Sequence, residues 1–255
     1  MGTTIVTLDE RPGLADLDTG LDRVWPEFLH HGAVTSRLWG ELWERFLPFQ
    51  LLVLDDDGAA LAKGHTIPFA WDGLAETLPD GVDGVLEAGV ALHEAGGEPT
   101  TLSALVAIVS PRRRGEGLSG IVIEGMRAIA ARHGLVDLVA PIRPTWKHRY
   151  PLTPFERYVE WRRHDGLPFD PWQRLHQRLG GEPLAIAWHS LVVSGSVAEW
   201  EDWTGLAFPE SGPYVVPDAL VPVEIDRAKD VGRYDEPNLW MRHRASLDRG
   251  MPPKG

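Results

Sequence analysis

The stretch that decides the fold is residues 107–119, which read AIVSPRRRGEGLS. The mostly apolar run before it, Thr101 to Val109, is typical of a buried strand. The residues after it, 118–133, have apolar side chains at helical spacing. The glycines let successive backbone N–H groups face one point, next to a helix N-terminus and three arginines. The stretch predicts a turn that binds a pyrophosphate; the alternative is a tight strand-to-helix turn with solvated arginines.

The same residues resemble the acyl-CoA-binding signature of the GNAT superfamily of N-acetyltransferases. That signature reads Val-x-Pro-x-x-Arg-Gly-x-Gly-(Leu/Ile)-Gly. The matching positions here are Val109, Pro111, Arg114, Gly115, Gly117 and Leu118. Ser119 departs from the pattern, since family members usually have Gly or Ala there. Its side chain is still small, so that a phosphate could approach the backbone closely.

The resemblance implies an α/β (α+β) fold with a mixed, mostly antiparallel central sheet flanked by helices. Its two central strands, 101–109 and 135–142, would splay apart, and the pantetheine arm would lie between them. Acetyl-CoA would be the co-substrate, with no metal, and an acceptor amine would attack the thioester directly. The residues that would bind the cofactor are Ile108, Val109, Arg112, Arg113, Arg114, Gly115, Glu116, Gly117, Leu118 and Ser119.

The resemblance also suggests a proton donor for the leaving thiolate. In the family a tyrosine often has this role, in a pattern similar to Leu-Tyr-x-x-Leu-Gly. Residues 175–180 read LHQRLG, which puts His176 in the tyrosine position. An imidazole can donate a proton near neutral pH, although a buried, hydrogen-bonded helix histidine is the simpler interpretation. Tyr150 and Tyr158 are alternatives. The strand 102–109 contains no carboxylate, so the general base stays open.

Outward from the motif, the remaining pattern predicts a mixed α/β layer structure. We expect one domain over residues 1–244, with an insertion at 72–99 that holds a weak helical patch at 82–94 and with an extended C-terminal strand region, and then a frayed tail at 245–255. The expected strands are 3–8, 49–54, 59–69, 184–193 and 215–225, and the expected helices are 14–29, 34–46, 155–161 and 171–179.

Composition narrows the class of protein. The chain has 255 residues, with 25 Lys and Arg against 37 Asp and Glu, for a net charge of −12. Residues 101–180 are basic, however, with 13 Lys and Arg against 7 Asp and Glu. This suits a small polyanionic ligand, and the alternative is a chance cluster of solvated helix faces. An acidic chain is unlikely to bind nucleic acid. The chain has no cysteine, no long apolar run and no secretory signal, so we expect a cytoplasmic protein without disulfides or membrane spans.

The leading hypothesis is therefore an acyl-CoA-dependent N-acyltransferase that moves acetyl to the amine of a small molecule. One alternative is a GNAT-fold transferase that uses an acyl or aminoacyl donor on a carrier protein or tRNA. Another is a non-catalytic CoA-ligand sensor. The aromatic and basic segment 144–151 fits a substrate wall and a surface loop equally well. Exposed edges of the C-terminal strands make a homodimer reasonable.

Overall fold

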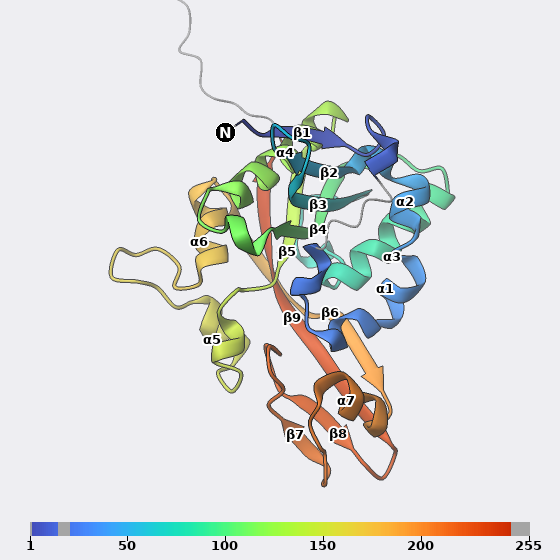
Figure 1. Ribbon diagram of the computed structural model, residues 1–255, viewed down its shortest axis with the longest axis vertical. Helices are drawn as coiled ribbons and strands as arrows, with labels where there is room; N and C mark the ends of the chain where they lie inside the picture. Colours follow the sequence, from blue (N-terminus) through green and yellow to red (C-terminus); the bar gives the residue numbers. More distant parts are fainter. Residues whose placement is uncertain (1, 15–20, 246–255) are drawn as a thin grey trace, which may run out of the picture.

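One sheet organises the chain in the computed structural model, which describes residues 2–14 and 21–245 (Figure 1). The described strands follow the order β1-β2-β3-β4-β5-β9-β8-β7, and β6 pairs with the free side of β9. All neighbours are antiparallel except β4 and β5. The strands are β1 Thr4–Thr7, β2 Gln50–Leu54, β3 Ala60–Phe69, β4 Thr101–Val109, β5 Asp137–Ile142, β6 Glu182–Gly195, β7 Gly212–Tyr214, β8 Val223–Asp226 and β9 Val231–Arg244. The mixed, mostly antiparallel sheet expected from the sequence is confirmed.

Helices cover both faces of the sheet. Helices α1 (Ala33–Leu38), α2 (Glu41–Arg45) and α3 (Gly81–Glu94) lie on one face, and α4 (Leu118–Arg132) and α6 (Pro171–Arg178) lie on the other (Figure 1). Each face has its own apolar core, with Leu138 of β5 packed in the α4 cluster and Val139 in the α3 cluster. Alternate residues of the strands therefore point to opposite cores.

Two further helices lie near the C-terminal strands. Helix α5 (Phe155–Val159) packs beside Ile142 of β5 and Leu220. Helix α7 (Val197–Thr204) begins with a capping box at Ser196 and Glu199 and covers the end of the sheet formed by β7 and β8.

The parallel pair β4 and β5 is joined only at one end. Its register runs from Thr101 opposite Asp137 to Ser103 opposite Val139 and stops there. From Ala104 to Val109, β4 pairs with β3 alone. A bulge at Leu105 increases the divergence, because it leaves one extra residue between the partners of His65 and Thr66. The expected splay of these strands is thus present.

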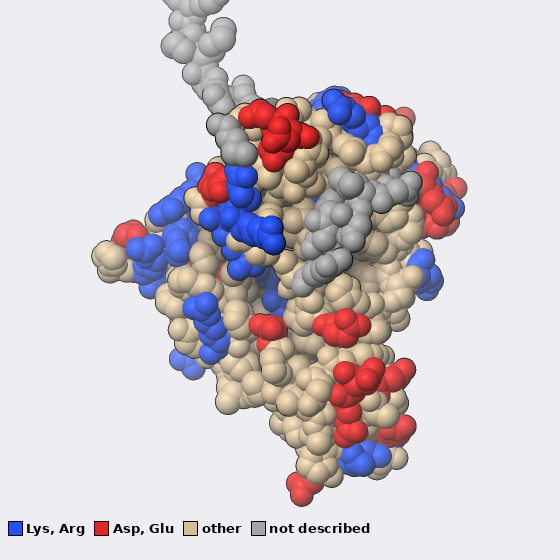
Figure 2. Space-filling view, viewed as in Figure 1, with Lys and Arg blue, Asp and Glu red and all other residues tan. Residues whose placement is uncertain are grey.

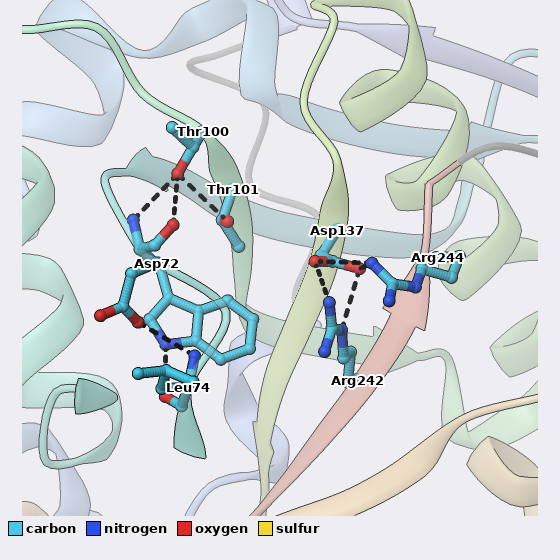
Figure 3. Close-up of polar contacts among 8 residues, drawn as sticks. Asp72, Leu74, Thr100, Thr101, Asp137, Arg242 and Arg244 are labelled. Atoms are coloured by element: carbon cyan, nitrogen blue, oxygen red, sulfur yellow. Dashed lines mark hydrogen bonds and ion pairs between the residues drawn. The ribbon is translucent and has the colours of Figure 1, made fainter. Parts of the chain in front are cut away.

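An ion cluster lies at the closed end of this pair (Figure 3). The buried carboxylate of Asp137, on β5, accepts hydrogen bonds from Arg242 of β9 at 3.0 and 2.8 Å. Arg244 donates to the same carboxylate at 3.2 Å. The Arg242 guanidinium also lies 5.2 Å from the centre of the Trp71 ring. These contacts tie β5 to β9 where β4 and β5 are still paired.

The N-terminal helices expected from the sequence are wrong in detail. In place of a helix over 14–29 there are 3₁₀ turns at Leu21–Val24 and Glu27–His31, separated at Pro26; residues 15–20 lie outside the described part of the chain. Proline cannot continue an α-helix because it lacks an N–H. The helix expected over 34–46 is two short helices, α1 and α2, interrupted at Trp39 and Gly40.

The C-terminal strands also differ from expectation. Most of the segment 215–225 is a loop rather than a strand. Only its last residues, from Val223 onward, belong to a strand, β8. Pro217 and Pro222 each lack an N–H for a sheet. The long strand β9 lies in the C-terminal strand region that was expected, but no strand was expected at its own residues, 231–244.

The segment 72–99 contains more structure than its weak pattern suggested. Helix α3 spans 14 residues, and Val85 and Leu86 on it are fully buried against the sheet core. At the other end of the chain, Ala245 is buried and its N–H donates to the carbonyl of Val136. The rest of the tail that we expected to be frayed, 246–255, lies outside the described residues.

Candidate active site

The divergence of β4 and β5 opens a cleft of about 1040 Å³. Its walls come from β4 (residues 104–109), from the glycine turn that follows β4, and from the end of β5. Trp25 and Trp39, the residue that follows α1, also line it. Since the edge of β4 that faces β5 is unpaired beyond Ser103, its backbone groups are open to a ligand that lies along the strand.

The glycine turn presents a row of unused amides at the mouth of this cleft. Gly115 and Gly117 have φ angles of +88° and +80°, which L-residues other than glycine rarely adopt. Residues 115–117 are exposed, and nothing lies within 4 Å of where either glycine would carry a Cβ. None of the amides of residues 114–119 donates a hydrogen bond to another described residue. The turn and the first turn of α4 therefore form an open anion-binding concavity.

Charge around the turn is mostly positive. Arg113 pairs with Glu116 at 2.7 Å, and this contact raises the pKa of Arg113 and holds the pKa of Glu116 below its usual range. Among the described residues no carboxylate is within ion-pair distance of the exposed Arg112 and Arg114. Figure 2 shows Lys and Arg side chains gathered on the side of the molecule where α4 and α6 lie. Glu116 is compensated by Arg113, so Arg112 and Arg114 give the turn a net positive charge.

The cofactor residues expected from the sequence are thus brought together. Nearly all of them line the cleft; Arg112 and Glu116 lie on the same turn outside that lining. Leu118 is buried and anchors α4 in the core, and Ile108 is buried within β4. Val109 and Ser119 are partly exposed beside the glycines.

A buried polar network forms part of the opposite wall, where β5 ends. Glu236 of β9 accepts hydrogen bonds from the Nε of Arg143 at 2.9 and 3.1 Å and from the Tyr234 hydroxyl at 2.8 Å. Asn238 donates to Glu236 at 3.3 Å and accepts from Ser190 at 2.6 Å. The Glu236 carboxylate is thus surrounded by donors, and it in turn raises the pKa of Arg143.

The position of this network follows from strand alternation. Trp240 of β9 and Val139 of β5 pack in the core beneath α3, so Asn238, Glu236 and Arg143 belong to that same face by the period of two. Arg143, Glu236 and Asn238 all line the cleft. Sequence reasoning missed all three because Arg143 is 93 positions from Glu236, its partner, and the three form no motif.

The loop 215–222 completes this wall. The buried amine of Lys147 donates to the carbonyl of Leu220 at 2.6 Å, and burial lowers the pKa of that amine to about 8. The N–H of Leu220 donates to the Tyr234 hydroxyl at 2.9 Å, and Arg143 donates to the carbonyl of Asp218. These bonds fix the loop so that Asp218 lines the cleft. Four residues of the segment 144–151 also line it: Thr145, Trp146, His148 and Arg149.

His176 lines the cleft and is almost completely buried. Its Nδ1 lies 2.9 Å from Nε2 of His243 on β9, and its own Nε2 has no partner among the described residues. Burial holds the pKa of His176 well below 6.5, and burial also lowers the pKa of His243 to about 4. Both rings are therefore neutral near pH 7, and one hydrogen lies between them.

The two tyrosines considered as proton donors do not line the cleft. Tyr150 is partly exposed and packs against Tyr158, Trp161 and Phe169. Tyr158 is buried, and its hydroxyl donates to Asp170 at 2.9 Å. Both belong to one aromatic cluster with Trp161 and Phe169, outside the lining of the cleft.

Residues 2–14 and 21–245 contain neither a metal-ligand cluster nor a membrane-spanning helix. No cluster of three or more His, Asp or Glu side chains there is arranged to hold a metal ion. None of the helices in the same residues has both the length and the hydropathy to cross a bilayer.

Comparison with known proteins agrees with this geometry, although no family model matches the chain. Arginine N-acetyltransferase avaD of Aspergillus versicolor is 33% identical over 274 residues, and the match covers 95% of this chain and 94% of that protein. The loading GNATL domain of CurA from Lyngbya majuscula superposes with a TM-score of 0.57 at 13% identity, covering 96% of this chain and 98% of the domain. The GphF GNAT-like decarboxylase, solved with isobutyryl-CoA, has a TM-score of 0.57 at 18% identity, covering 96% and 100%. The chain belongs to the GNAT superfamily of N-acetyltransferases.

Proposed function

We propose that this protein transfers the acetyl group of acetyl-CoA to an amine of arginine or a chemically similar small molecule. The observation that carries the proposal is the cleft, which connects a row of unused amides to a polar wall through two splayed strands. The relative that is 33% identical is named an arginine N-acetyltransferase, which supports the acceptor class.

The donor half of the site is assigned to the turn after β4. The amides of residues 114–119 would bind the pyrophosphate of the cofactor, with Arg112 and Arg114 adding positive charge. The pantetheine arm would lie along the unpaired edge of β4 from Val109 toward Ala104. Extended backbone without a strand partner suits an amide-bearing chain, because each can satisfy the other's hydrogen bonds.

The chemical step is a direct attack. The nitrogen of the acceptor amine bonds to the thioester carbonyl carbon, the carbon–sulfur bond breaks, and the amine loses a proton to water. His176 is assigned to the departing sulfur, because the residue lines the cleft and its buried Nε2 has no partner among the described residues. When His243 donates to Nδ1, the neutral ring carries its hydrogen on Nε2 and stabilises the thiolate with a hydrogen bond. Tyr150 is given no role.

The experiment that tests the donor site is calorimetric titration of acetyl-CoA into the protein and into Gly117→Glu. A glutamate there adds negative charge and a side chain to the concavity, so binding should be lost. Gly96→Glu is the matched control, since Gly96 also has a positive φ angle and open space around its Cβ position but lies outside the cleft. Equal affinity of Gly117→Glu and the parent would contradict the assignment.

The alternatives from the sequence are not favoured. The relative that is named an arginine N-acetyltransferase favours a small-molecule reaction over a donor carried on tRNA or a carrier protein. A CoA-binding sensor without turnover would not need the polar wall that faces the glycine turn. Small amines remain the proposed partners. A cytoplasmic location and a homodimer stay predictions, and size-exclusion chromatography with light scattering tests the latter.

A further inference from the structure

The wall of the cleft opposite the glycine turn carries charges of both signs. Arg143 and Arg149 line it as cations, and Glu236 and Asp218 are the carboxylates that line the cleft within the described residues. Glu236 is only 3% exposed and already receives hydrogen bonds from Arg143, Tyr234 and Asn238. The negative charge of Glu236 is therefore already compensated by donors of the protein itself. Asp218 is then the carboxylate of this wall that a ligand can reach.

Arg143 has one end free. Its Nε donates to Glu236 and its Nη2 donates to the carbonyl of Asp218. No hydrogen bond among the described residues uses its Nη1, although the Tyr234 hydroxyl also lies close enough to the guanidinium to raise its pKa. The side chain is 17% exposed, and the residue lines the cleft. A guanidinium held in place on two nitrogens presents the third in a fixed direction, which suits a carboxylate.

Asp218 is held in place by backbone hydrogen bonds, as Arg143 is by side-chain hydrogen bonds. It has a φ angle of +65°, which is uncommon outside glycine. The loop around it is held through its own carbonyl and through both backbone groups of Leu220. Its carboxylate is 61% exposed, and the nearest basic group with which it pairs is His148, at 4.0 Å. A cationic group of a ligand could therefore bind it directly.

We infer that the acceptor is an amino acid with a cationic side chain, its carboxylate bound by Arg143 and its side-chain cation by Asp218. This rests on the proposed acetyl transfer and narrows its substrate class. The observation behind it is one free guanidinium nitrogen and one exposed carboxylate on the same wall, joined by the hydrogen bond from Arg143 to the backbone of Asp218. A simple amine without a carboxylate would leave Arg143 unused.

The test compares substrates that differ by one charged group. Acetyl transfer is measured with arginine, with agmatine, which lacks only the carboxylate, and with citrulline, which lacks the guanidinium charge. Lysine with cadaverine and ornithine with putrescine extend the panel. We expect each accepted amino acid to have a kcat/KM about 10- to 100-fold above that of its decarboxylated partner. Equal use of both partners, or preference for the bare amine, would overturn the inference.

Variants locate the two contacts. Arg143→Lys keeps a cation beside Glu236 but removes both Nη1 and the hydrogen bond to the Asp218 carbonyl. It should therefore lower kcat/KM for arginine by a larger factor than kcat/KM for agmatine, so that the ratio between the two substrates falls. Asp218→Asn should abolish the preference for arginine over citrulline. Asp230→Asn is its control, because Asp230 has a similar φ angle of +50° and lies outside the cleft. An Arg143→Lys protein that still prefers arginine over agmatine to the parental degree would refute the carboxylate contact.

Failure of the underlying function has a different signature. If acetyl-CoA binds in calorimetry but no member of the panel is acetylated, both the proposed activity and the substrate class are wrong. If agmatine and the other bare amines are acetylated as fast as the amino acids, the transfer activity stands and only the assignment of Arg143 fails.

Discussion

Replacement of His65 by glutamine is expected to make the stability of the protein less sensitive to acid. His65 lies on β3, completely enclosed, with its Nδ1 3.2 Å from the side-chain oxygen of Gln50. The rings of Trp39 and Trp43 meet it edge-on. Burial, with a smaller effect of Lys63, lowers the pKa of His65 to about 3. The folded protein therefore keeps this ring neutral at pH values where the unfolded chain protonates it.

The size of the effect follows from proton linkage. The unfolded chain has a histidine pKa of about 6.5, so it binds more protons than the folded state between that value and about 3, and stability falls as the pH falls through this window. Between pH 7 and pH 5 the loss from His65 is about 2 kcal/mol. His243, with a pKa of about 4, adds a similar loss. Asp83 acts in the opposite direction: burial raises its pKa to about 6, so its protonation returns about 1 kcal/mol over the same interval.

The assay is urea denaturation of the parent and His65→Gln at pH 7 and pH 5. Glutamine can keep a hydrogen bond to Gln50 but cannot titrate, so the variant should lose about 2 kcal/mol less than the parent between the two pH values. His164→Gln, at an exposed position, is the control and should behave like the parent. If His65→Gln and the parent lose the same stability, His65 is not held neutral by burial.

Three other predictions concern the ion cluster around Asp137, the glycine turn and His176. Asp137→Asn leaves Arg242 without its buried partner, so it should lower the free energy of unfolding by about 3 kcal/mol; Arg244→Gln, at a largely exposed side chain, should cost far less in the same denaturation experiment. Glu116→Gln removes a negative charge from the turn, so calorimetry should find tighter acetyl-CoA binding, with a gain that shrinks as salt rises; weaker binding would contradict the charge argument. His176→Asn should lower kcat by about 100-fold without changing the Kd for acetyl-CoA, and the parent kcat should show no titration of His176 between pH 6 and 8, since its pKa lies well below that range.

The residues proposed as the donor half of the site could be singled out because they are local in sequence. One strand, one glycine turn and one helix are consecutive, and the positive φ angles of Gly115 and Gly117 follow from a pattern that only glycine satisfies without strain. The same holds for His176, which was found by its place in a short helical pattern. The structure puts it beside the cleft, whereas Tyr150, chosen by proximity in sequence alone, is not there.

The acceptor half could not be predicted, since its parts meet only through the fold. Arg143 and Glu236 are 93 positions apart and join because β5 pairs with β9. Strand β9 itself was hidden, because Glu236, Asn238 and His243 are polar residues that are buried in it. Their burial is tolerated because hydrogen bonds and ring contacts satisfy most of their polar atoms. A hydropathy pattern does not contain that information.

Strand β9 has a consequence for how acceptor range can diverge among relatives. It carries the carboxylate of Glu236 and reaches β8, whose preceding loop holds Asp218, whereas the donor turn extends from β4, which has no sheet contact with β7 or β8. Insertions or replacements in residues 215–222 would therefore change the proposed binding site for the amine and leave the proposed acetyl-CoA site at the glycine turn unchanged. Sequence differences between enzymes that share a donor but accept different amines should accumulate in that loop before they appear around Gly117.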